Sequence, residues 1–152
     1  MRVYLDTNVF GRLFDDKSQL RIALESEACL IILELIKQEK LDCLSSDILR
    51  LEISRSSIMR RIHMQSLIKI SSKHVSETSK LKGIAKQIGK ESEVEGRDAL
   101  HIASACLGEA EYFITCDDDL TKKHRKIEKI TKKLGYKIKI INPLYFIEEV
   151  KL

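Results

Sequence analysis

The chain has 152 residues and a mass of 17.5 kDa, which favours a single domain over residues 1–152. Its 43% hydrophobic and 33% charged residues, with six glycines and one proline, exclude a disordered or collagen-like chain. A net charge of +4 permits a polyanionic partner, but so small an excess also occurs on proteins that never bind nucleic acid.

The cysteines and the apolar stretches indicate the cellular compartment. The four cysteines are widely spaced and form no C-x-x-C pair, which predicts reduced, buried thiols rather than a zinc knuckle or a disulfide framework. Asp6 and Asn8 interrupt the N-terminal apolar run, and Glu34 interrupts the longest apolar stretch, residues 28–36. We therefore expect a cytoplasmic protein with no signal peptide and no contact with a membrane.

The first elements alternate a short apolar run with longer helical patterns. A strand is predicted at residues 3–5, and residues 9–14 have helical character. Apolar residues at spacings of three and four predict an amphipathic helix over residues 20–38. A second strand is predicted at residues 41–44.

The middle of the chain is predicted to be helical. Ser46 or Asp47 can cap a helix that carries Glu52, because their side-chain oxygens can accept a hydrogen bond from its first turn. The helical pattern continues through Lys69 and returns over residues 75–88. No strand is predicted in this part of the chain.

The last third repeats the alternation of helix and strand. A glycine-led polar break at residues 89–93 precedes a helix over residues 97–107 that is rich in small residues. A third strand is predicted at residues 112–115 and a strongly basic helix at residues 120–134. A fourth strand follows at residues 137–141.

A closing helix is expected after the fourth strand, because Pro143 suits the first turn of a helix. Strands that alternate with helices favour parallel pairing. The chain therefore predicts an α/β fold of three α/β/α layers around a central parallel sheet of four or five strands. No internal repeat or domain boundary is visible.

Two of the predicted strands end in acidic residues: Asp6 follows the first, and Asp117 to Asp119 follow the third. Sites in open parallel sheets lie outside the carboxyl ends of the strands, so these acids are expected to meet. If the backbone stays extended, alternation sends Asp117 and Asp119 to one side and leaves Asp118 solvated or capping the next helix. Taken singly, each acid has a simpler explanation as a helix cap or first-turn charge.

Three residues elsewhere have the same ambiguity. Asp98 lies near the start of a predicted helix, where an acid is favoured for structural reasons. His101 shares its helix face, and we favour a hydrogen-bonding role for it over a role as a metal ligand. Glu52 could simply be an exposed residue that pairs with Arg50 or Arg55.

Four segments, taken in order, resemble the PIN-domain family. They are LDTNV from Leu5, an isolated Glu52 on the third helix, DALHIASA from Asp98, and FITCDDDL from Phe113. The resemblance extends from Asp6 to the closing NPLYF segment. Length and motif order are similar to the single-domain VapC-type ribonuclease toxins.

The resemblance implies a PIN-like fold and an acidic pocket that binds Mg²⁺ or Mn²⁺ and hydrolyses RNA. The implied catalytic acids are Asp6, Glu52, Asp98, Asp117 and Asp119, and all of these except Glu52 are implied metal ligands. Thr7, Asn8 and Thr115 match small polar residues that brace the acids. The resemblance also implies a homodimer and a small antitoxin protein as a partner.

The chemistry of such a pocket favours a metal independently. Converging carboxylates repel one another and raise their own pKa values until a cation neutralises them. Oxygen ligands without thiolates suit Mg²⁺ or Mn²⁺, which can lower the pKa of an attacking water and stabilise charge on a phosphate. One ion or two, and Asp119 or Glu52 as the group that positions the water, remain alternatives.

Residues 120–139 contain nine Lys and Arg residues and one acid, Glu128. A solvated helix face explains most of them, but Lys122 and Lys123 begin next to the acidic cluster and are the candidates for contacts with RNA phosphates. Aromatic residues make up only 5% of the chain, with no Trp. This composition favours recognition of RNA shape or of a structured loop over base stacking.

Other functions fit the sequence less well or remain alternatives. Asn8 breaks the D-x-D pattern of haloacid-dehalogenase-type phosphatases, and no glycine-rich turn follows the first strand as dinucleotide binding requires. A receiver-like domain would need an acidic pair near the first strand. A catalytically inactive PIN-like RNA-binding or protein-interaction module remains an alternative, as does an RNA-processing nuclease that is not a toxin.

Overall fold

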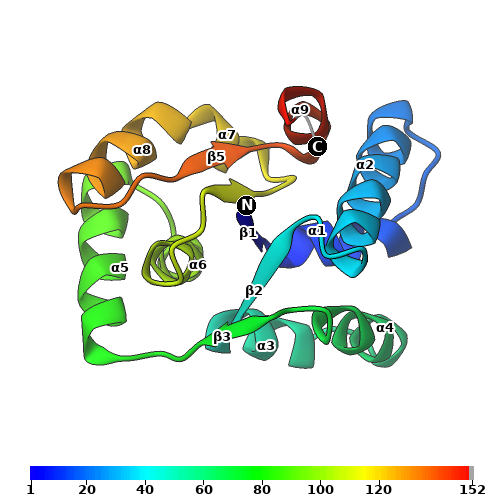
Figure 1. The fold of residues 1–152 in the computed structure, drawn as a ribbon, viewed down its shortest axis with the longest axis horizontal. Helices are drawn as coiled ribbons and strands as arrows, with labels where there is room; N and C mark the ends of the chain where they lie inside the picture. Colours follow the sequence, from blue (N-terminus) through cyan, green and yellow to red (C-terminus); the bar gives the residue numbers. More distant parts are fainter. Residues whose placement is uncertain (151–152) are drawn as a thin grey trace.

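The computed structural model describes residues 1–150 and contains a five-stranded, all-parallel sheet with helices on both faces (Figure 1). The strands lie in the order β3-β2-β1-β4-β5. They are β1 (Arg2–Leu5), β2 (Asp42–Ser46), β3 (Lys73–Val75), β4 (Tyr112–Ile114) and β5 (Lys139–Ile141). The expected α/β fold with a parallel sheet of four or five strands is confirmed.

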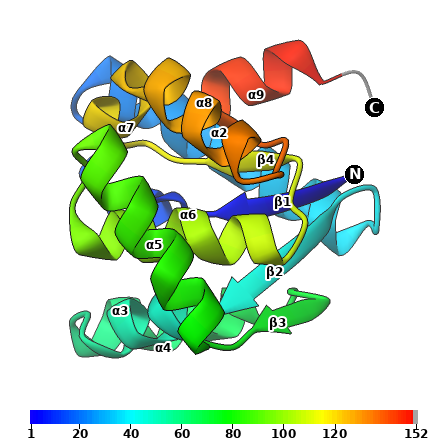
Figure 2. The same cartoon turned by 90° about the vertical axis from the view of Figure 1, so that its left-hand side faces the viewer.

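The helices divide between two apolar cores, one for each face of the sheet (Figures 1 and 2). The first core takes side chains from α1 (Thr7–Gly11), α2 (Leu20–Lys37), α3 (Asp47–Ser54), α4 (Ile58–Ile68) and α9 (Pro143–Glu149), and the 3-10 turn Arg12–Phe14 packs beside it. The second takes side chains from α5 (Ser79–Ser92), α6 (Gly96–Leu107), α7 (Asp118–Lys122) and α8 (His124–Lys133).

The central strand β1 shows how a short sequence serves both cores. Val3 and Leu5 pack in the first core, and Tyr4 packs in the second, because successive side chains of a strand point to opposite faces. Tyr4 stacks on Phe113 of the neighbouring strand β4, with ring centroids 5.3 Å apart and an interplanar angle of 8°. Helices are therefore held close to both faces of β1.

Three predicted elements differ from the structure. Strand β3 was not expected, and the helix predicted over residues 75–88 begins at Ser79 instead, with the Thr78 side chain as its cap. The predicted break at residues 89–93 is wrong, because α5 continues to Ser92 and ends at Glu93 with φ of 57°. The predicted basic helix over residues 120–134 is two helices, α7 and α8.

Gly89 lies inside α5, beside α6. A Cβ atom at this position would lie 3.5 Å from the Val94 carbonyl oxygen and 3.6 Å from Ala99 Cβ, which are ordinary van der Waals contacts. The glycine is therefore a helical residue rather than a chain break, and the packing does not require it to lack a side chain.

Side-chain hydrogen bonds tie the two edge strands of the sheet to neighbouring elements. On β3, His74 Nδ1 lies 2.8 Å from Ser45 Oγ, and His74 Nε2 lies 2.7 Å from Asp47 Oδ1. On β5, the Ile140 N–H donates to Glu128 Oε2 at 3.1 Å. Both edges are thus tied to elements of the same chain.

Two expectations about composition can be compared with the structure. The four cysteines are free thiols and all are buried, as predicted: Cys29, Cys43, Cys106 and Cys116. None of the helices within residues 1–150 combines the length and apolar character that a membrane span requires.

Candidate metal centre

Four of the five predicted acids line one cleft of about 350 Å³ at the carboxyl edge of the sheet: Asp6, Glu52, Asp98 and Asp117. Asp6 follows β1, and Asp117 follows the adjacent strand β4. Glu52 comes from α3, and Asp98 comes from the first turn of α6. Residues separated by more than 100 positions therefore meet because β1 and β4 pair in parallel.

Asp6 is the most firmly held of these acids. Its Oδ1 accepts a hydrogen bond from the Thr7 N–H at 2.8 Å and so caps α1. Its Oδ2 accepts from Thr115 Oγ1 at 2.8 Å and from Asn8 Nδ2 at 3.2 Å. Burial raises the pKa of Asp6, and the nearby His101 and these hydrogen bonds only partly oppose that rise.

Asn8 and Thr115 join the ends of β1 and β4. Asn8 Nδ2 donates to Thr115 Oγ1 at 3.1 Å, and Asn8 Oδ1 accepts from the Cys116 N–H at 2.9 Å. Thr115 Oγ1 also accepts from the Asp117 N–H at 3.0 Å. Both side chains thus fix the backbone that carries Asp6 and Asp117.

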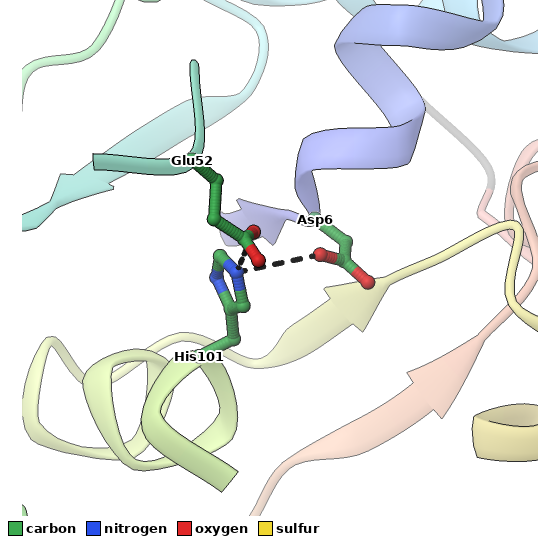
Figure 3. Close-up of side chains that lie close together, drawn as sticks. All are labelled: Asp6, Glu52 and His101. Atoms are coloured by element: carbon green, nitrogen blue, oxygen red, sulfur yellow. Dashed lines mark hydrogen bonds and ion pairs between the residues drawn. The ribbon is translucent and has the colours of Figure 1, made fainter. Parts of the chain in front are cut away.

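A buried chain of hydrogen bonds runs from the sheet to Glu52. Ser46 Oγ lies 2.6 Å from the Tyr4 hydroxyl, which lies 2.6 Å from His101 Nδ1. His101 Nε2 lies 2.5 Å from Glu52 Oε1, and Thr7 Oγ1 donates to the same oxygen at 2.5 Å. Figure 3 shows dashed lines from the His101 imidazole to both Glu52 and Asp6, and the Asp6 Oδ1 lies 3.8 Å from the same Nε2.

His101 donates through Nε2 in every arrangement that satisfies these contacts. A bare Nε2 lone pair facing a carboxylate at 2.5 Å would be repulsive, so this nitrogen carries a proton. In neutral His101, Nδ1 accepts from the Tyr4 hydroxyl; in the protonated form, Nδ1 donates to it. Burial opposes protonation of His101, but the hydrogen bond to Glu52 and the charge of Asp6 outweigh it and raise the pKa.

Asp6, Glu52 and His101 each offer one ligand atom, and these atoms lie within 4.8 Å of one another, so the group could hold a metal ion. His101 is only 1% exposed, and both of its ring nitrogens are engaged with protein groups. Coordination through Nε2 would break the bond to Glu52. The geometry therefore favours a hydrogen-bonding role for His101 and leaves the carboxylates as the candidate ligands.

Asp98 and Glu52 differ sharply in their surroundings. The pKa of Asp98 is raised to about 6 by burial and by the negative charges of Asp6 and Asp117. Burial also opposes ionisation of Glu52, but hydrogen bonds from His101 and Thr7 outweigh it and lower the pKa. A cation in the cleft would offset the repulsion at Asp98, and the carboxylate oxygens without thiolates fit a hard divalent ion.

The acidic run after β4 is arranged differently from the prediction. The extended backbone does not persist, because α7 begins at Asp118 and Asp117 accepts the Asp119 N–H at 2.9 Å. Asp118 does not cap α7; its side chain is 45% exposed and forms a two-pronged pair with Arg21, at 2.9 and 2.5 Å. Asp119 is exposed and does not line the cleft.

The basic residues near the cleft are also different from those predicted. Arg60 lines the cleft, and Arg97 Nη1 lies 3.7 Å from Glu52 Oε2, where a pair with Arg50 or Arg55 was the simpler expectation. Lys123 Nζ donates to the Glu93 carbonyl oxygen at 2.8 Å. Lys122 faces a separate hollow beside α9.

Tyr4→Phe tests how much the buried chain of hydrogen bonds contributes to stability. Loss of the hydroxyl leaves Ser46 and His101 Nδ1 without their buried partner, so we expect a cost of about 1–3 kcal/mol in the free energy of unfolding. Urea denaturation measures it, and Tyr136→Phe, at a partly exposed ring, is the matched control. Equal stability of the two variants would contradict this account of the chain.

A family model described as PIN domain matches residues 3–126. The matched segment includes every candidate site residue and ends before β5 and α9. A search of curated proteins found no match.

Proposed function

From the premise that this chain belongs to the PIN domain family, a nuclease-type family that depends on divalent metal, we propose that it is a Mg²⁺- or Mn²⁺-dependent endoribonuclease. The observation that supports this most is the convergence of Asp6, Glu52, Asp98 and Asp117 on one cleft. Carboxylates placed this close together suit a divalent cation and a phosphate substrate.

Asp6, Asp98 and Asp117 are the proposed metal ligands, since each lines the cleft. Asp119 is proposed as a fourth ligand and as a catalytic acid on the family resemblance alone, because its side chain lies outside the cleft. A bound divalent ion lowers the pKa of an attacking water and neutralises charge that develops on the phosphate. Thr7, Asn8 and Thr115 support the site through the hydrogen bonds described above.

Glu52 is the proposed group that orients the attacking water. Its Oε1 is occupied by Thr7 and His101, so Oε2 is the oxygen that can accept a hydrogen bond from water in the cleft. The hydrogen bonds that lower its pKa keep it ionised, which suits an acceptor that orients the water. Arg97, which is exposed beside Glu52, can bind a phosphate of the substrate strand, whereas the Arg60 guanidinium is already paired with Asp15.

Cleavage of a labelled RNA, with and without added metal, tests the nuclease proposal. We expect cleavage in Mg²⁺ or Mn²⁺ and none in excess chelator, with activity restored when the metal is returned. Undiminished cleavage in chelator would overturn the metal-dependent mechanism. Binding of RNA without cleavage in any divalent metal would instead support an inactive RNA-binding module.

We also propose that the nuclease is a VapC-type toxin and forms a homodimer through its helices. A small antitoxin would cover exposed apolar side chains of α2 and α4 and present an Arg or Lys to the acids. The exposed residues are Leu20, Leu24, Leu30 and Ile31 on α2, and Ile58, Met59 and Ile62 on α4. Exposed apolar side chains on these two helices would be buried by such a partner.

Induced expression of the chain alone tests the toxin proposal. Growth should stop, and co-expression of the adjacent small open reading frame should restore it. Normal growth at high expression, with no small protein copurifying, would overturn the toxin role and leave an RNA-processing nuclease. A mass measurement in solution tests the homodimer.

A further inference from the structure

Positive charge is concentrated on two helices that are far apart in the sequence. Helices α5 and α8 hold nine of the 27 Lys and Arg residues but only two of the 23 Asp and Glu residues. The rest of the chain therefore contains more acidic than basic residues. The nine are Lys80, Lys82, Lys86, Lys90, Arg125, Lys126, Lys129, Lys132 and Lys133.

The two helices form one surface, which we call the α5–α8 surface and define by these nine residues. Figure 2 shows α5 and α8 over the same face of the molecule, with α6 behind α5. They meet where Lys126 lies 3.8 Å from Glu93 and Lys133 lies 4.0 Å from Glu91. All nine basic side chains are exposed, and the other seven form no ion pair within residues 1–150.

Folding does not require this charge. The packing of α5 uses Leu81, Ala85 and Ile88, and the packing of α8 uses Ile127 and Ile130, all on the opposite faces of their helices. Like charges held at this density repel one another and oppose the compact state. The α5–α8 surface is therefore better suited to an external polyanion than to the stability of the fold.

The α5–α8 surface reaches the candidate metal centre. Helix α5 ends at Ser92, and α6 begins four residues later with Asp98 in its first turn. Next to this connection, Arg97 is 62% exposed and its Nη1 lies 3.7 Å from Glu52 Oε2. Phosphates bound on α5 and α8 could thus continue past Arg97 to the cleft.

We propose that the α5–α8 surface binds the phosphate backbone of a helical RNA segment next to the strand that is cleaved. Neither helix carries a Phe, Tyr or Trp on which an unpaired base could stack, and His124, at the start of α8, lies with its Nδ1 3.2 Å from Glu128 Oε2. A duplex offers phosphates in a regular, rigid array and hides its bases, which matches a surface made of cations alone. Lys82, Lys86 and Lys90 form a stripe about 12 Å long on α5.

This inference rests on the proposed function for the nature of the ligand, so its test measures binding without cleavage. Binding is measured with the Asp98→Asn variant in excess chelator. The probes are a labelled RNA hairpin and an unstructured RNA of the same length. Lys82→Gln/Lys86→Gln/Lys129→Gln removes three charges from the α5–α8 surface. The matched control, Lys37→Gln/Lys40→Gln/Lys69→Gln, removes three exposed charges from other helices and loops.

We expect the surface variant to weaken hairpin binding by at least about tenfold and to reduce the slope of log affinity against log salt by about two units. The control variant should bind nearly as well as its parent. Equal weakening by both variants, or an unchanged slope, would overturn the proposal. Tighter binding of the unstructured RNA than of the hairpin would overturn its helical part.

The outcome is independent of the nuclease assay. If the surface variant loses hairpin binding but the parent protein cleaves no RNA in any divalent metal, the role of the α5–α8 surface is supported and the proposed function fails. If the parent protein cleaves RNA but the surface variant binds the hairpin normally, the proposed function is supported and the role of the α5–α8 surface fails. Circular dichroism of both triple variants confirms that the helices remain folded.

Discussion

Asp98→Asn is expected to abolish RNA cleavage and, at the same time, to make the metal-free protein more stable above pH 6. Loss of a ligand charge should reduce metal-dependent cleavage by at least about 100-fold, since even groups that only orient a ligand contribute ten- to a hundredfold. The gain in stability arises because ionised Asp98 is half-buried beside Asp6 and Asp117, and the asparagine removes that repulsion.

The sign of the effect follows from the pKa of Asp98, which is about 6 in the folded protein against an ordinary value of 3.8. The folded state binds the proton more tightly, so its stability falls as pH rises from about 4 to about 6. The variant does not titrate at this position. The gain in stability of Asp98→Asn over the parent should therefore be complete above pH 6 and disappear below about pH 4.

Thermal unfolding in chelator, across this pH range, measures the effect. Glu27→Gln, at an exposed position on α2, is the control for loss of a negative charge. A melting temperature of Asp98→Asn below that of the parent at pH 7.5 would contradict the electrostatic account. Cleavage at the parental rate would contradict the role of Asp98 in the site.

Phe113→Ala is expected to have the largest effect on stability. Phe113 is fully buried in β4 and stacks on Tyr4, so its truncation leaves a cavity and costs about 3–5 kcal/mol. The melting temperature should fall by about 10 °C or more. Phe113→Leu fills most of the same space and should cost clearly less.

The Tyr4 ring gives this variant a consequence at the metal centre. Removal of the stacked neighbour frees the ring whose hydroxyl contacts His101, so the position of Glu52 becomes less well defined. Cleavage measured well below the melting temperature should therefore fall in Phe113→Ala and be largely kept in Phe113→Leu. Equal stability of the two variants would show that the ring stack contributes little.

Elements whose pattern is local could be predicted from the sequence. The spacing of apolar residues in α2 and the proline at the start of α9 are properties of neighbouring residues, and both helices are present. Strand β3 has three residues and depends on contacts of His74 with other elements, so no periodicity marks it. The glycine and the polar residues after it are typical of a break, but α5 continues past Gly89 to Ser92.

The candidate site was predictable to a similar extent. The convergence of Asp6 and Asp117 follows from strand order, whereas Glu52 was singled out only through the family resemblance. The chain from Tyr4 to Glu52 joins residues of three elements, which no spacing in the sequence reveals. The displacement of Asp119 from the cleft follows from the start of α7 at Asp118, two residues earlier than the predicted helix.

The hydrogen bond from Ile140 to Glu128 affects how the molecule meets other chains. The Lys139 N–H donates to the Glu111 carbonyl oxygen, and the Thr115 N–H donates to the Ile141 carbonyl oxygen, so the Ile140 N–H between them points away from β4. A free N–H on an edge strand can pair with a strand of another molecule and promote aggregation. Glu128 occupies this donor with a charged carboxylate. An incoming strand would have to displace that charge, so β5 ends the sheet and resists growth into β-stacked assemblies.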